Sequence, residues 1–292
     1  MTNGDRSEPS FFQLAEVITT HVFHPTDLAA GSAPSFHHAV RLALTGPARL
    51  TAMHVAEDGD AQVELPGVRQ VLVRWNKLRD TEDEKGLEAL RLSVRKAVTE
   101  DGDAVDGCLA HLIRHPAQWL VLSTGQRKGA ARWLNGSVAE ALVRRSRINA
   151  LVLPLGVPGF VLPEDGRVVL KRVLLPVGPP QLARMATMGL AQLLDRYACH
   201  QVEVVLLAVG AGSMPADLRD RLPAKAAVIE RTEDGDLVPT ILDTCDRMAA
   251  DLVVMSTEGH DSWMDSLWGS HTEQVLRSAQ APLLVVPSKL PG

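Results

Sequence analysis

Two stretches of the chain, each 19 residues long, follow the same pattern. The first, Gly136 to Pro154, reads GSVAEALVRRSRINALVLP, and the second, Gly269 to Pro287, reads GSHTEQVLRSAQAPLLVVP. Each begins with Gly-Ser, continues through a helix-like segment with a glutamate and an arginine at matching places, and ends in a short apolar run closed by proline. Such an internal repeat predicts two copies of one folding unit in this chain.

The total length supports two units, because 292 residues is long for one simple core and domains of about 100 to 150 residues are typical. The stretch from Pro154 to Pro163 is rich in proline and glycine and is expected to connect the two units. We therefore predict an N-terminal domain over residues 1–156, a linker over 157–167 and a C-terminal domain over 168–292.

Apolar, β-rich runs alternate with helical patterns in both halves, which predicts α/β layers with a five-stranded parallel sheet in each half and helices on both faces. Asp103 is expected to cap one of the helices. The expected strands are Ile18–Phe23, Arg49–Val55, Leu92–Val98, Trp119–Thr124 and Ala150–Pro154, then Arg172–Val177, Val202–Val209, Ala226–Arg231, Leu252–Thr257 and the LLVVP run that ends at Pro287.

Composition argues against several classes of protein. The net charge of −5 gives no general attraction to nucleic acid, so none is expected as a partner. The longest apolar stretch, Ile148 to Pro163, is broken by prolines and glycines, so no membrane insertion is expected. The first residues show no secretory signal, and the cysteines are far apart in sequence, which favours a cytoplasmic protein.

The loops that follow strands are where a ligand of such a sheet would bind. Asp27 comes just after the first strand, where its carboxylate can accept hydrogen bonds from a base or a ribose, although aspartate is also an ordinary turn residue. The loops Ser123–Ser137 and Ser256–Ser270 each end in Gly-Ser at the expected start of a helix. Free N–H groups there can bind phosphate, although Gly-Ser is also a common helix cap.

These motifs resemble the universal stress proteins in a tandem two-domain form. Nucleotide-binding members carry a glycine, two residues, a glycine, nine residues, and a glycine followed by serine or threonine. In the second half, Ser256, Gly259, Gly269 and Ser270 occupy this spacing, with serine in place of the first glycine. The resemblance implies two tandem Rossmann-like (adenine nucleotide alpha hydrolase-like) domains and a pocket for ATP or AMP.

The first half departs further from the family pattern. The same spacing falls on Ser123, Gln126, Gly136 and Ser137, so both upstream glycines are replaced, although Gly125 lies nearby. Gln126 adds bulk where phosphate needs access to the backbone. The resemblance therefore implies a partly degenerate phosphate loop in this half.

The family's acid after the first strand matches Asp27, whereas its counterpart in the second half is Gly178, which has no side chain. Each half thus keeps a different part of the family's site. Carried over residue by residue, the resemblance implies a nucleotide-binding set of Pro25, Thr26, Asp27, Val55, Gly125, Gly136, Ser137, Ser256, Gly259, Gly269 and Ser270.

No catalytic or metal motif accompanies this pattern. The histidines lack HExxH spacing, no GxSxG or Walker A motif occurs, and no carboxylate pair for magnesium stands beside the phosphate loops. We therefore expect no enzyme, no catalytic residue and no metal. Trp263 and Trp268 near the second loop suit either ligand stacking or helix packing.

Three functions remain open from the sequence. The first is a non-enzymatic stress-response protein whose nucleotide pocket changes its conformation or its choice of a regulatory protein partner. The second is a nucleotide-independent interaction scaffold, and the third is a slow ATPase. Since single-domain relatives commonly dimerise through their last strands, the resemblance also implies that ALVLP and LLVVP pair as an intramolecular pseudo-dimer, and a homodimer of two chains is possible.

Overall fold

The computed structural model describes most of the chain, in segments 19–56, 64–99, 103–124, 138–199, 201–210, 214–257 and 267–288. The first half runs through β1 (Thr20–Pro25), η1 (Ala30–Ser32), α1 (Ala33–Leu42), β2 (Ala48–Val55), α2 (Val68–Arg74), α3 (Glu84–Ala89), β3 (Leu92–Thr99), α4 (Ala104–Arg114), β4 (Trp119–Thr124), α5 (Val138–Ser146) and β5 (Asn149–Pro154).

The second half repeats the alternation of strand and helix. Its elements are β6 (Arg172–Val177), α6 (Pro180–Arg196), β7 (Glu203–Val209), η3 (Arg219–Arg221), β8 (Ala227–Glu233), α7 (Leu237–Arg247), β9 (Leu252–Thr257), α8 (Leu267–Ser278) and β10 (Leu283–Pro287). The predicted α/β class with five strands in each half is therefore confirmed.

The local sequence explains several of these elements. Asp103 caps α4 as expected, because its Oδ1 accepts hydrogen bonds from the backbone N–H groups of Val105 and Asp106, each at 2.9 Å. The strand β5 is buried along its whole length, which matches its continuous apolar run. The first strand differs from expectation, since β1 continues to Pro25 rather than ending at Phe23. Proline is tolerated there because the N–H of Thr26, directly after the strand, supplies the next hydrogen bond to β2, to the carbonyl of Met53 at 2.9 Å.

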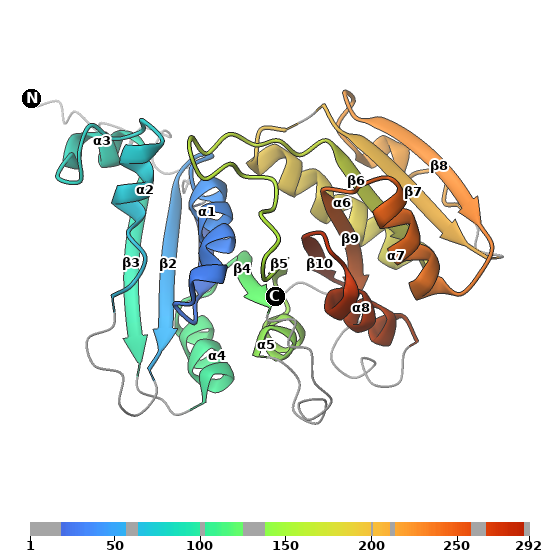
Figure 1. The fold of residues 1–292 in the computed structure, drawn as a ribbon, viewed down its shortest axis with the longest axis horizontal. Helices are drawn as coiled ribbons and strands as arrows, with labels where there is room; N and C mark the ends of the chain where they lie inside the picture. The colour runs from blue at the N-terminus through green and yellow to red at the C-terminus, as the bar shows by residue number, and fades with distance from the viewer. Residues whose placement is uncertain are drawn as a thin grey trace, which may run out of the picture.

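The strands form a single ten-stranded sheet in the order β3-β2-β1-β4-β5-β10-β9-β6-β7-β8. Figure 1 shows the two halves side by side with helices on both faces of this sheet. Within each half the neighbouring strands are parallel. The strands β5 and β10 are antiparallel, with Leu284 opposite Leu151.

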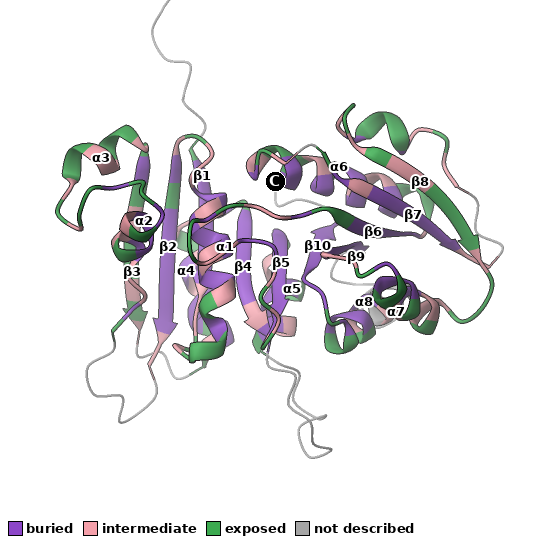
Figure 2. Ribbon diagram, turned by 45° about the horizontal axis from the view of Figure 1, so that its top comes forward, coloured by how far each residue is buried: buried purple, intermediate pink, exposed green. Residues whose placement is uncertain are grey.

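This pairing confirms the predicted intramolecular pseudo-dimer, because β5 and β10 are the apolar ends of the two repeated stretches. Each strand covers an edge that would otherwise be open to other chains. The remaining edges, β3 and β8, carry many exposed and half-buried residues, in contrast to the buried central strands (Figure 2).

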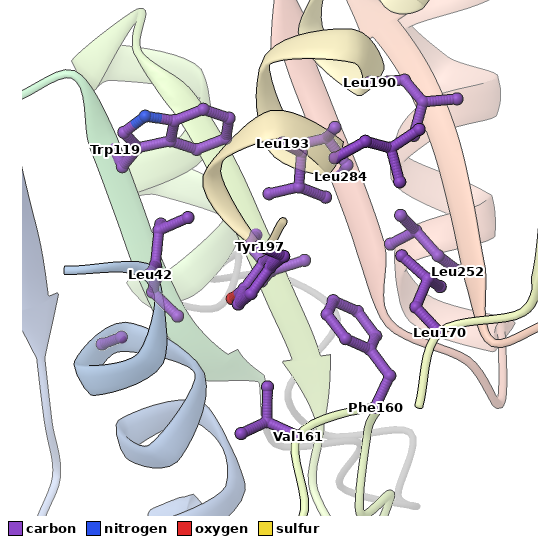
Figure 3. Close-up of a cluster of buried hydrophobic side chains, with 14 of the residues drawn as sticks. Leu42, Trp119, Phe160, Val161, Leu170, Leu190, Leu193, Tyr197, Leu252 and Leu284 are labelled. Carbon is purple, nitrogen blue, oxygen red and sulfur yellow. The ribbon is translucent and has the colours of Figure 1, made fainter. Parts of the chain in front are cut away.

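Buried apolar side chains form a layer on each face of the sheet, and each layer runs through both halves. Figure 3 shows part of the first layer, where Phe160 and Tyr197 lie between Leu42 of α1 and residues of the second half. The rings of Phe160 and Tyr197 are edge-on, with centroids 5.3 Å apart. The halves therefore share a core rather than meeting only at a strand edge.

The segment between β5 and β6 is anchored to the first half by His38 of α1. The His38 Nδ1 donates to the carbonyl of Pro34 at 2.7 Å, so Nε2 is unprotonated and accepts from the N–H of Phe160 at 3.0 Å. The two rings are in edge contact, with centroids 4.5 Å apart. The hydroxyl of Tyr197 donates to the backbone carbonyl of His38 at 3.0 Å, which connects α6 to the same helix.

Candidate functional site

The first half places its candidate site where β1 and β4 lie next to each other. The chain leaves β1 toward β2 on one side and leaves β4 toward β5 on the other, so the strand order reverses between them. In open α/β sheets a ligand binds outside the carboxyl ends of the strands at such a point. Thr26 and Asp27 follow the carboxyl end of β1, as the sequence predicts.

The Asp27 carboxylate organises the turn after β1. Its Oδ1 accepts hydrogen bonds from the N–H of Ala29 at 3.1 Å and from the hydroxyl of Ser32 at 2.6 Å. Leu28 between them has a φ of 60°, a left-handed conformation that these bonds help to hold. Asp27 is exposed, and within the part of the chain that the structure describes its Oδ2 makes no hydrogen bond. Asp27 thus stabilises the turn and also keeps an accessible carboxylate.

A chain of hydroxyl groups joins this turn to the end of β4. Ser123 donates to the hydroxyl of Ser35 at 2.8 Å, and Ser35 donates to the backbone carbonyl of Ser32 at 2.8 Å. Ser32 in turn donates to Asp27. Ser32 and Ser35 were not among the residues identified from the sequence, although the GSAPS segment around them offered the signal.

This chain explains how serine is accommodated at position 123. The residue lies in β4, before the loop, and its hydroxyl is held by Ser35 at the start of α1. The Ser123 side chain is therefore directed to α1, and it joins the end of β4 to the start of that helix.

The other expected residues of the first strand end are close to β2. The N–H of Thr26 donates to the carbonyl of Met53 at 2.9 Å, and His54 Nδ1 donates to the carbonyl of Thr26 at 2.9 Å. Pro25 is half-buried at the end of β1, and Val55 is half-buried at the end of β2, where it packs against the core layer. Pro25, Thr26, Asp27 and Val55 thus come together at one edge of the sheet.

His24 lies directly beneath this edge. It is fully buried, and its Nδ1 donates to the carbonyl of Val121 at 2.8 Å. Its Nε2 is therefore unprotonated, and this atom has no hydrogen-bond partner within the described residues. Burial lowers the pKa of His24 to about 4, so the ring is neutral at pH 7.

The predicted phosphate side is only partly placed. Gly125, Gly136, Ser137 and Gly259 lie outside the described residues, as do Gln126 and Trp263. In the first half α5 begins at Val138, directly after the expected Gly-Ser.

In the second half α8 begins at Leu267, so Gly269 and Ser270 lie within its first turn rather than before it. This helix was expected to begin at Ser270, and α8 begins three residues earlier. The first turn still presents backbone N–H groups without partners inside the helix, because these are the first residues of α8.

Comparison with known proteins agrees with this architecture. The model of the universal stress protein family matches the chain twice, over residues 19–154 and 170–287. The chain belongs to the universal stress protein family. Each match spans one of the two halves described above. Among curated proteins no sequence matches significantly.

Two solved structures that span most of this chain show the same fold. A universal stress protein from Archaeoglobus fulgidus has 18% identity and a TM-score of 0.59, covering 91% of this chain and 96% of that chain. A functionally unknown protein from Pseudomonas aeruginosa has 11% identity and a TM-score of 0.58, covering 92% and 93%. A universal stress protein in complex with cAMP has 20% identity and a TM-score of 0.32, covering 47% of this chain and 98% of that chain.

The second half of this universal stress protein lacks the turn that carries Asp27. Only Gly178 and Pro179 connect β6 to α6, whereas the first half has residues 26–32 between β1 and α1. Substituting Gly178 with aspartate would therefore not rebuild the site, because the loop itself is too short. The second half was expected to lack only the acid, but it lacks the whole turn that carries Asp27 in the first half.

The second half is also packed tightly around Ser256. This residue is the last but one of β9 and is 1% exposed, and its hydroxyl has no hydrogen-bond partner within the described residues. Nearby, a Cβ on Gly189 of α6 would lie 2.4 Å from a methyl carbon of Val286, the neighbour of Ser256 in the sheet. The close approach of α6 leaves Ser256 covered rather than open to a ligand.

No group of metal-ligating side chains was found among the described residues. In the same part of the chain, no helix is long and apolar enough to cross a membrane.

Cys108 and Cys245 are buried thiols whose pKa is raised by burial, to about 12 and about 11. Neither thiol is therefore an activated nucleophile.

Proposed function

We propose that this universal stress protein is a non-enzymatic, cytoplasmic stress-response regulator that binds an adenine nucleotide, ATP or AMP, in its first half only. The observation that carries the proposal is the exposed Asp27 carboxylate, held in place by Ser32 through Oδ1 while Oδ2 makes no hydrogen bond within the described residues. A bound nucleotide would change the surface beside the turn after β1 and hence the choice of a regulatory protein partner.

The chemistry of Asp27 suits the sugar or the base of a nucleotide. A carboxylate accepts hydrogen bonds, and both a ribose hydroxyl and the adenine amino group donate them. Because one oxygen is already engaged by Ser32 and the N–H of Ala29, the carboxylate is oriented before the ligand arrives. Such preorganisation reduces the entropy lost on binding.

The phosphates would lie at the start of α5, on the other side of the strand reversal. The first N–H groups of a helix lack partners inside the helix, and the helix dipole favours an anion at this end. In the sequence the Gly-Ser pair directly precedes Val138, the first residue of α5, which supports this choice. Gly136 and Ser137 are therefore proposed to contact the phosphates through their backbone N–H groups.

A nucleotide-independent scaffold is the second candidate. It is favoured by the second half, where the turn after β6 is reduced to Gly178 and Pro179 and Ser256 is covered. A half that binds no ligand would then serve to hold the shared sheet and core. A slow ATPase is the third candidate, and it would need carboxylates that hold magnesium beside the phosphates.

Calorimetric titration tests the proposal with the full chain and ATP, AMP and cAMP in turn. We expect one site per chain, with binding weakened by about tenfold to a hundredfold in Asp27→Ala, because one buried or half-buried hydrogen bond is worth on the order of 1 to 3 kcal/mol. Asp220→Ala is the matched control, since Asp220 is exposed in η3 on the second half. Equal affinity in Asp27→Ala and the parent chain would favour the scaffold.

A further inference from the structure

Six basic side chains lie near the amino-terminal halves of three neighbouring strands. Asp27 lies at the other end of these strands, after their carboxyl ends. His21 is the second residue of β1 and lies in register with Arg49 on β2. The last turn of α4 reaches the same place. The cluster, called the basic cluster below, consists of His21, Arg49, Arg95, His111, Arg114 and His115.

Direct contacts tie the basic cluster together. Arg95 Nη1 donates to Nε2 of His115 at 3.0 Å. The rings of His111 and His115 have centroids 4.8 Å apart, and His111 is stacked on Phe23 of β1 at 5.3 Å. Two hydrogen bonds hold the ring of His21. Its Nδ1 donates to the carbonyl of Pro116 at 2.7 Å, and its Nε2 accepts from the hydroxyl of Thr51 at 2.9 Å.

Among the described residues, the basic cluster has no acidic partner. Every charged side chain that acts electrostatically on the rings of His21, His111 and His115 is itself basic. Within the described residues, Arg49 and Arg95 form no ion pair. This is unusual in a chain with a net charge of −5, in which acidic residues outnumber basic ones.

The end of α4 explains only part of this arrangement. Carbonyl groups at a helix C-terminus favour nearby positive charge, which accounts for Arg114 and His115. Arg49 and Arg95 are on strands, are exposed, and are not part of that helix end. Within the described residues, the charges of these two guanidinium groups remain uncompensated.

His111 adds a buried polar atom to the basic cluster. Its side chain is 5% exposed, and its Nε2 is buried without a hydrogen-bond partner within the described residues. A buried polar atom without a partner costs free energy, and such atoms are uncommon in folded proteins. Burial and the neighbouring positive charges lower the pKa of His111 to about 4.

We propose that the basic cluster is a binding site for a phosphate-type oxyanion, held by the guanidinium groups of Arg49 and Arg95 with His115 beside them. Guanidinium presents paired N–H donors that match two oxygens of a phosphate group, and it keeps its charge at all relevant pH values. The anion would supply the countercharge that the cluster lacks.

This site differs from the proposed nucleotide site, because the two lie at opposite ends of the same strands. The chemistry does not separate free phosphate from the phosphate group of a small organic monoester. Inorganic phosphate and glycerol 3-phosphate are therefore both used as probes. A preference for the monoester would identify the phosphate of a larger molecule as the ligand.

The test is a titration of the full chain with each probe at constant ionic strength, followed through the histidine ring signals in NMR spectra. His115→Gln assigns the signal of His115. We expect saturable shifts of the His115 signal in the parent chain. In the double variant Arg49→Gln/Arg95→Gln the apparent dissociation constant should rise by at least about tenfold, because charge-assisted hydrogen bonds are lost.

The control variant is Arg144→Gln/Arg172→Gln, which removes the same charge from two exposed arginines on α5 and β6. It should bind both probes like the parent chain. A non-saturable shift, or equal weakening in the two double variants, would show a general salt effect and overturn the proposal. Loss of nucleotide binding in Asp27→Ala with intact phosphate binding here would keep the two sites distinct.

Discussion

Arg277 of α8 donates two hydrogen bonds to the carboxylate of Glu140 in α5, from Nε at 2.8 Å and from Nη2 at 2.9 Å. These two residues are the arginine of the second repeated stretch and the glutamate of the first. Arg277 also contacts Glu273, one turn earlier in α8. The repeated Glu and Arg thus serve to join the two halves across the β5–β10 junction, and the neighbouring carboxylates raise the pKa of Arg277.

Replacing Arg277 should weaken the junction. The Glu140 side chain is only 11% exposed, so Arg277→Ala would leave a mostly buried carboxylate without this partner. We expect a loss of about 1 to 2 kcal/mol in the free energy of unfolding, measured by urea denaturation. Arg144→Ala is the matched control, because Arg144 occupies the equivalent place in the first stretch and is exposed. Equal losses in both variants would contradict the assigned role.

Acid should destabilise this protein through its buried histidines. Burial lowers the pKa of His24 and His38 to about 4, below the value of about 6.5 in an unfolded chain. The unfolded state therefore binds protons first as the pH falls. The stability is fully present above pH 6.5 and is lost between about 6.5 and 4, by about 2 kcal/mol for each ring at pH 5.

His24→Leu isolates one of these contributions. Its Nε2 has no partner within the described residues, so the substitution removes a titrating group while keeping a similar volume. Urea denaturation at pH 7.5 and pH 5 should show a pH-dependent loss about 2 kcal/mol smaller than in the parent chain. An unchanged difference between the two pH values would mean that His24 does not titrate in this range.

Ser32 should influence nucleotide affinity although its replacement leaves the charge of the Asp27 carboxylate unchanged. Ser32→Ala removes the hydroxyl that orients Asp27, while the carboxylate itself remains. We expect ATP binding to weaken by about threefold to tenfold, less than in Asp27→Ala, because one neutral hydrogen bond is lost. Ser93→Ala, at an exposed position on the edge strand β3, is the control. Calorimetric titration of both variants gives the comparison.

Gly159 tests the attachment of the inter-half segment to α1. It has a φ of 73°, and a Cβ there would lie 2.4 Å from Cε1 of His38. Gly159→Ala should therefore cost about 1 to 3 kcal/mol in the free energy of unfolding. Gly156→Ala separates the two causes, because Gly156 has a φ of 84° but no atom within 4 Å of the added Cβ. The extra loss at Gly159, read by urea denaturation, measures the contact with His38.

The alternation of apolar runs and helical patterns was sufficient to predict the α/β class, the number of strands in each half and most strand bounds, because burial on both faces of a parallel sheet imposes its own pattern. The position of Asp27 was also predictable, since a loop residue directly after a strand must lie at the carboxyl end of the sheet. The pairing of β5 with β10 came from the resemblance to a family and not from the apolar pattern.

Contacts between residues distant in sequence were decided only by the tertiary structure. The pattern alone did not show that Arg277 bonds to Glu140 or that Phe160 packs against His38. It also did not show that Ser35 connects Ser123 to the turn of Asp27. A linear sequence determines which elements form, whereas the partners of a polar side chain depend on how those elements pack together.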